Sequence, residues 1–182
     1  NTGFITSSVF GLKTRTGGAA LVVRAIRPEL ESKDVSFAVF SGSTQVLRTG
    51  LIRNVYNNEK WNFALSLKPN FHPYQNFHTS SNASGSRYQL DFIGYNSHGN
   101  YVANSFHLSH SFGDDNDEAS YKFLTPSKAI FVGAHYHEID SGTLVARTDI
   151  LASQVRYWNS VITAEELKYH SYNPSNYGVS SP

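Results

Sequence analysis

Hydrophobic and polar positions alternate along much of the chain, which is the pattern of β-strands with one buried face. The clearest run is Trp61–Lys68, in which every second residue from Trp61 is tryptophan, phenylalanine or leucine, and Tyr88–Phe92 repeats the alternation. Two further runs, Ala19–Ile26 and Val35–Phe40, are apolar on both faces, as in the central strands of stacked sheets. The remaining predicted strands are Ile130–Gly133 and Gln154–Trp158.

Short loops rich in glycine, serine, asparagine and aspartate separate these runs. Many short strands between such loops predict an all-β fold, a two-sheet antiparallel β-sandwich. One short helix is predicted near the C-terminus, because Thr163 and Glu166 have the spacing of a capping box ahead of good helix formers. It should end near Asn173–Pro174, since proline disfavours helix in the residue before it. With 182 residues, the whole chain (1–182) is expected to be one domain.

Composition and charge narrow the expected partners. Fifteen lysines and arginines against 14 acidic residues give a net charge of +1, without a basic cluster, so we expect no nucleic-acid partner. No apolar run approaches the roughly 18 residues of a membrane-spanning helix, so we expect no membrane insertion. The absence of cysteine excludes disulfides and thiolate chemistry. The many Ser, Asn, Gly and Tyr residues are common in extracellular, cell-surface and virion β-proteins, and a start at Asn1 suggests a processed or larger protein.

The last forty residues carry a family resemblance. The run Val155–Asn159, followed by Ile162–Leu167, resembles the closing "V-R-x-Y/W-N" strand and "L-S/T-x-x-E-I/L" helix of laminin-G/pentraxin-like domains. Phe131–Ala134 and Trp61–Leu65 resemble two other strands of the same group, which belongs to the concanavalin A-like superfamily. The resemblance implies a jelly-roll fold from about Gly18 onward. It does not imply one activity, because that superfamily includes lectins, adhesion modules, glycoside hydrolases and architectural domains.

Two constellations offer little catalytic or zinc chemistry. Glu138–Asp140 resembles the start of the "E-I-D-x-x-E" motif of jelly-roll glucanases, but Thr143 stands where the second glutamate belongs. Because retaining hydrolysis needs two carboxyls, we predict no catalytic residue. His135 and His137 would share a strand face, yet no third zinc ligand is fixed by their spacing.

An acidic loop and a set of loop aromatics are better candidates for binding. Calcium is bound by clustered oxygen ligands, which the acidic loop supplies. Its candidate ligands are Asp114, Asp115, Asn116, Asp117 and Glu118. Aromatic rings in loops stack on the apolar faces of sugars. The candidate carbohydrate-binding residues are Tyr74, Phe77, Tyr95, Tyr101 and Tyr136.

Two functions follow as expectations. The first is a non-catalytic structural or interaction domain of a larger surface or virion assembly, with neighbouring protein subunits as partners. The alternative is a lectin-like adhesion module that binds surface glycans, with calcium as an optional cofactor. A glycoside hydrolase is a distant third, because its second carboxylate is missing.

Overall fold

The computed structural model describes residues 5–15, 18–69, 88–112, 123–136, 144–147, 150–173 and 175, with the backbone alone at 5, 134–136 and 144–147. The described residues form antiparallel strands and one helix near the C-terminus. They group into two compact units, each of which combines two parts of the chain. One unit is Asn1–Glu59 with Thr125–Val155, and the other is Lys60–Leu124 with Arg156–Pro182.

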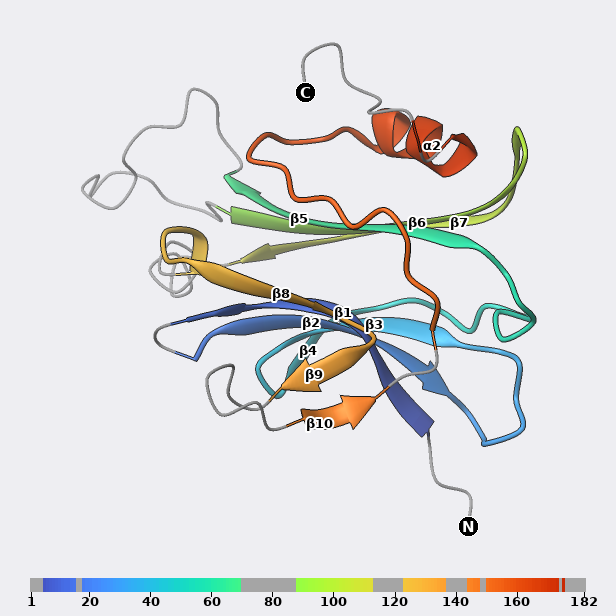
Figure 1. Cartoon of the computed structure of the whole chain (residues 1–182), viewed down its shortest axis with the longest axis horizontal. Helices are drawn as coiled ribbons and strands as arrows, with labels where there is room; N and C mark the ends of the chain where they lie inside the picture. The colour runs from blue at the N-terminus through green and yellow to red at the C-terminus, as the bar shows by residue number, and fades with distance from the viewer. Residues whose placement is uncertain are drawn as a thin grey trace. The chain divides into compact units, whose positions relative to one another are not determined.

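The first unit contains a five-stranded antiparallel sheet in the order β4-β3-β2-β1-β8 (Figure 1). Its strands are β1 (Ile5–Thr14), β2 (Ala20–Arg27), β3 (Ser36–Ser41), β4 (Thr44–Arg48) and β8 (Lys128–Val132). After β8, Gly133 adopts a positive φ of 69°, and the chain continues into a small sheet of β9 (Ala134–Tyr136) and β10 (Leu144–Arg147).

The central strands of this sheet are buried on both faces. Val22, Val23, Ala38 and Val39 are all 1% exposed or less, although successive residues point to opposite faces. Both faces of β2 and β3 are therefore covered, as the continuous apolar runs predict.

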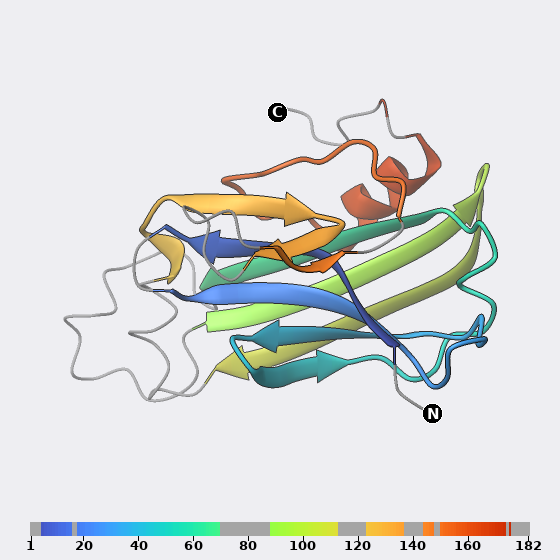
Figure 2. The same ribbon diagram turned by 60° about the horizontal axis from the view of Figure 1, so that its bottom comes forward.

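The second unit contains a three-stranded antiparallel sheet in the order β5-β6-β7. The strands are β5 (Trp61–Pro69), β6 (Tyr88–His98) and β7 (Tyr101–Phe112). The helix α2 (Ala164–Tyr172) lies over one face of this sheet, against β5 and β6 (Figures 1 and 2).

The opposite face of the three-stranded sheet is apolar and lined with aromatic rings. Trp61 stacks on Phe63 with ring centroids 5.6 Å apart, and Phe92 packs against Phe106 with centroids 4.9 Å apart. Gly94 lies opposite Phe106 in the register, and the Phe106 ring occupies the space that a Cβ at Gly94 would need. Because Gly94 has no side chain, the Phe106 ring of the neighbouring strand β7 packs over β6 at this position.

The observed fold confirms the predicted all-β class: two antiparallel sheets and one short helix near the C-terminus, consistent with a β-sandwich. Of the predicted strands, only Gln154–Trp158 is wrong, because residues 150–163 form no strand. Gln154 has a φ of 57°, in the left-handed region, which interrupts an extended run. The sequence pattern did not predict strands β1, β4, β7 and β10. No helix among the described residues is long and apolar enough to cross a bilayer.

Candidate functional site

The face of the three-stranded sheet that carries α2 is polar. Strand register places Lys68 opposite Gln89, and Asp91 opposite both Ser66 on β5 and Ser109 on β7. Because side chains alternate between faces, these residues share the face opposite the aromatic rings. At one end of this face α2 covers the sheet, and at the other end a cluster forms around Asp91.

Asp91 is the buried centre of this cluster, with its side chain only 4% exposed. The Lys68 ammonium lies 2.7 Å from Oδ2 of Asp91. The Ser109 hydroxyl and the Gln89 amide donate to Oδ1 at 2.5 Å and 2.6 Å. His107 Nε2 is 3.5 Å from the same oxygen, on a side chain that is half exposed. Every buried carboxylate oxygen therefore has a donor, as burial requires.

These contacts keep the Asp91 carboxyl ionised. Burial raises its pKa, but the hydrogen bonds from Lys68, Ser109 and Gln89 lower it by more, so the pKa lies below the ordinary value of 3.8. The Ser109 hydroxyl donates to this carboxylate, and the lowered pKa makes the carboxylate a weak proton acceptor. The cluster is chemically suited to fixing the register of three strands and to presenting Lys68 and His107 at its rim.

Helix α2 is fixed to the other end of the polar face. The predicted capping box is confirmed: Glu166 N–H donates to the Thr163 hydroxyl at 3.2 Å, and Thr163 N–H donates to the Glu166 carboxylate at 2.8 Å. The backbone N–H and hydroxyl of Thr163 hold the pKa of Glu166 below its usual value. The helix ends at the C-cap residue Asn173, also as predicted.

Three side chains of the sheet hydrogen-bond to the helix. The Tyr95 hydroxyl donates to the Ala164 carbonyl at 3.2 Å, and the Asn62 amide donates to the Leu167 carbonyl at 3.5 Å. The buried hydroxyls of Ser97 and Ser171 lie 2.7 Å apart. Burial raises the pKa of Tyr95, which Lys168 partly opposes, so the hydroxyl keeps its proton and remains a donor. The helix is therefore held rigidly on the sheet.

The segment that leads into α2 has one side packed and one side exposed. Arg156 Nη1 lies 2.6 Å from Nδ1 of the buried His170, and the Trp158 ring packs against the His170 ring at 5.9 Å. Val155 and Tyr157, which alternate with these two residues, are 59% and 57% exposed. Exposed and packed side chains therefore alternate at 155–158 although these residues form no strand. The reason is that α2, rather than a neighbouring strand, covers one side.

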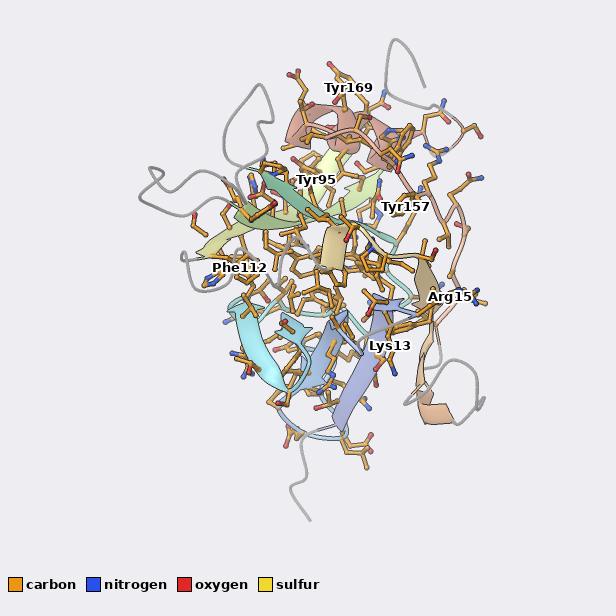
Figure 3. The ribbon with its side chains drawn as sticks, turned by 90° about the vertical axis from the view of Figure 1, so that its left-hand side faces the viewer. Lys13, Arg15, Tyr95, Phe112, Tyr157 and Tyr169 are labelled. Carbon is orange, nitrogen blue, oxygen red and sulfur yellow. The ribbon has the colours of Figure 1, made fainter. Side chains whose placement is uncertain are left out.

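Of the five sequence-predicted sugar-binding residues, the structure describes the side chains of Tyr95 and Tyr101. Tyr95 lies beneath α2 and bonds to it (Figure 3). Tyr101 begins β7 and is 69% exposed. Tyr136 ends β9, where only the backbone is described, and Tyr74 and Phe77 lie outside the described residues. Whether any of them contacts a sugar stays a prediction.

The predicted calcium loop also lies outside the described residues. This applies to each of its members, Asp114, Asp115, Asn116, Asp117 and Glu118, and to the partial glucanase motif Glu138–Asp140 with Thr143. His107 and His110 lie on opposite faces of β7, because they are three residues apart on a strand. Within the described ranges, no group of three or more His, Asp or Glu side chains could hold a metal ion.

Sequence reasoning missed the Asp91 cluster. Lys68 and Asp91 are both charged residues inside strongly apolar strands, which is a signal of a buried pair when the two strands are neighbours. The pairing of β5 with β6 would have been needed to see that their side chains meet.

Comparisons of the chain with protein-family models, with curated proteins and with solved structures found no match.

Proposed function

We propose that this chain is a non-catalytic interaction domain of a larger surface or virion assembly, where it binds neighbouring protein subunits. The observation that carries the proposal is a pair of exposed apolar side chains shortly before α2. Tyr157 is 57% exposed and Val161 is 42% exposed. We call these two residues the apolar segment.

The apolar segment differs from scattered surface hydrophobics, because its two residues are close in sequence and the residues on either side of Tyr157 pack against α2. These flanking residues, Arg156 and Trp158, contact His170 of the helix. Tyr169, which is 52% exposed, lies on the helix itself, and Figure 3 places Tyr157 on the segment that leads to it. A held segment loses little conformational entropy on binding. Burial of one such side chain by a partner contributes about 1.5–3 kcal/mol.

The cluster around Asp91 supports binding rather than catalysis. Its carboxylate is saturated by donors from Lys68, Ser109 and Gln89, and a retaining glycosidase would need a free carboxylate with a second one about 5 Å away. The same donors stiffen the sheet to which α2 is attached. A rigid scaffold that presents apolar side chains is what a protein-binding surface requires.

The experiment is affinity purification of the tagged full chain from the source that produces it. The variant Tyr157→Asp/Val161→Asp places two charges in the apolar segment, and Leu30→Asp/Leu51→Asp serves as control, since both leucines are exposed and lie outside that segment. We expect neighbouring subunits to co-purify in fixed ratio with the wild type and the control, and to be lost from the segment variant. Equal recovery with all three proteins would overturn the proposal.

A glycan-binding module is the second candidate, favoured by Tyr101. This tyrosine is 69% exposed and follows the turn between β6 and β7, where His98 and Asn100 are also exposed. An exposed ring beside polar side chains is suited to stacking on a sugar. A glycan array with calcium and again with chelator tests it, using Tyr101→Ala as the matched variant. Binding that Tyr101→Ala removes would establish this function, and loss with chelator would add calcium.

A further inference from the structure

Strand β7 forms a long margin of the three-stranded sheet. It runs for 12 residues and, among the described strands, pairs only with β6 (Figure 2). Ser105, His107, Ser109 and Ser111 are exposed along it, and the residues between them are half-buried. The outer side of such a strand presents a row of backbone N–H and C=O groups that another extended strand can bind.

Beyond a register irregularity at Ala103, strand β7 lacks the features that normally protect an edge. Sheet margins are commonly guarded by charged side chains, proline, short length or bulges. No Asp, Glu, Lys, Arg or Pro occurs from Tyr101 to Phe112, and the register with β6 is regular from Asn104 to Phe112.

The other three margins of the two sheets each carry such protection. Strand β5 ends in Lys68–Pro69. Strands β4 and β8 are only five residues long, and they include Arg48 and Lys128, respectively. Among the described strands, a long margin without such protection is therefore specific to β7.

We infer that β7 binds β7 of a second copy of this chain, antiparallel, so that the two three-stranded sheets become one continuous sheet. This inference deepens the proposed function by naming a partner, and it rests on that function. The margin at β7 is a different surface from the apolar segment. An experiment can therefore refute the strand pairing without refuting the proposed function, and the reverse.

The properties of β7 fit a second copy. A two-fold axis brings the same strand together in antiparallel orientation, and a register that keeps the faces aligned places like side chains side by side. Phe106, Leu108 and Phe112 would then extend one apolar face across both copies, and Ser105 and Ser111 would extend the polar face. Because β7 carries no acidic residue, lysine or arginine, no fixed charge opposes this pairing.

The first measurement is the mass of the full chain by sedimentation, at concentrations up to about 100 μM, where an interface with a Kd near 1 μM is filled. We expect twice the 20.2 kDa of one chain. In Ser105→Lys/Ser111→Lys, the paired strands carry four added lysines, and we expect the mass to halve. The matched control, Thr44→Lys/Gln45→Lys, adds the same charge at exposed positions of β4 and should remain a dimer.

A second readout uses the absence of cysteine from the chain. Single cysteines at Ala103, Ser105, His107 and Ser111 are oxidised one at a time. Since a two-fold axis brings one position of the strand close to its own copy, we expect disulfide-linked dimer to peak at one of these positions and to fall on either side. Uniform cross-linking along the strand would contradict a fixed register.

The remaining outcomes separate this inference from the proposed function. A monomeric wild type overturns strand pairing, as does a Ser105→Lys/Ser111→Lys variant that folds and remains dimeric. If the dimer is lost only in Tyr157→Asp/Val161→Asp, the self-association belongs to the apolar segment, which overturns the β7 interface and supports the proposed function. Far-ultraviolet circular dichroism confirms that each variant is folded.

Discussion

Replacing Lys68 with methionine tests whether the Asp91 cluster stabilises the sheet. Methionine keeps the length of the side chain and removes the ammonium group, which lies 2.7 Å from a carboxylate that is 4% exposed. Hydrogen bonds to charged groups contribute about 1.5–3 kcal/mol, and removing one partner of a fully buried ion pair costs about 3–5 kcal/mol. Lys68 is 29% exposed and Asp91 retains Ser109 and Gln89, so the lower range applies. We expect the free energy of unfolding to fall by about 2 kcal/mol.

The assay is guanidinium unfolding followed by tryptophan fluorescence, with a double-mutant cycle. Asp91→Asn removes the charge that Lys68 pairs with, so the double variant should lose less than the sum of the two single losses, by about 1–2 kcal/mol. Lys60→Met is the control, because Lys60 is an exposed lysine close in sequence, and its effect should stay within about 0.5 kcal/mol. Additive losses in the cycle, or a Lys68→Met loss no larger than the control's, would refute the assigned role.

The pH dependence gives an independent check of the same pair. The folded-state pKa of Asp91 lies below its ordinary value of 3.8, so its contribution to stability is present above that value and is lost as the pH falls toward the folded-state pKa. The stability gap between wild type and Lys68→Met should therefore be full near pH 7 and smaller at about pH 3. A gap of the same size at both values would show that Lys68 acts by packing alone.

Three further substitutions test the attachment of α2 and the packing of β6. Thr163→Ala removes the N-cap and should cost about 1 kcal/mol in denaturant unfolding, whereas an unchanged midpoint would count against the cap. Tyr95→Phe removes the hydroxyl that donates to the Ala164 carbonyl and should cost about 1 kcal/mol, with hydrogen exchange rising first in the helix. Gly94→Ala places a Cβ where the Phe106 ring lies and should cost about 1–3 kcal/mol; no loss of thermal stability would mean that the ring moves aside freely.

The features that could be predicted from sequence are those that a local pattern encodes. The capping box needs only Thr163 and Glu166, three residues apart, and the helix begins and ends where they and Asn173 indicate. The alternation in Trp61–Lys68 likewise predicts a strand, because its two faces meet different surroundings. In the structure every residue of β5 is half-buried, since the strand lies at a margin and α2 packs against it.

The wrong strand at Gln154–Trp158 shows what alternation does not encode. Arg156 and Trp158 face the His170 side chain while Val155 and Tyr157 face outward, so the period of two reflects covering by a helix. A burial pattern reports which side is covered, and it carries no information about whether the cover is a strand, with ladder hydrogen bonds, or a helix.

The Asp91 cluster could not be predicted from the sequence, because it depends on the register between neighbouring strands. The sequence of one strand does not encode that register. Lys68 and Asp91 belong to strands whose pairing places Lys68 opposite Gln89, diagonal to Asp91, and Ser109 arrives from a third strand. A slip by one residue in either pairing would turn the partner residues to the aromatic face and leave the carboxylate buried without a donor. The cluster therefore disfavours sheets in a wrong register as well as stabilising the sheet in the correct one. A sheet whose register is fixed in this way can present β7 at its margin in one alignment, which is the condition for a specific strand-to-strand contact.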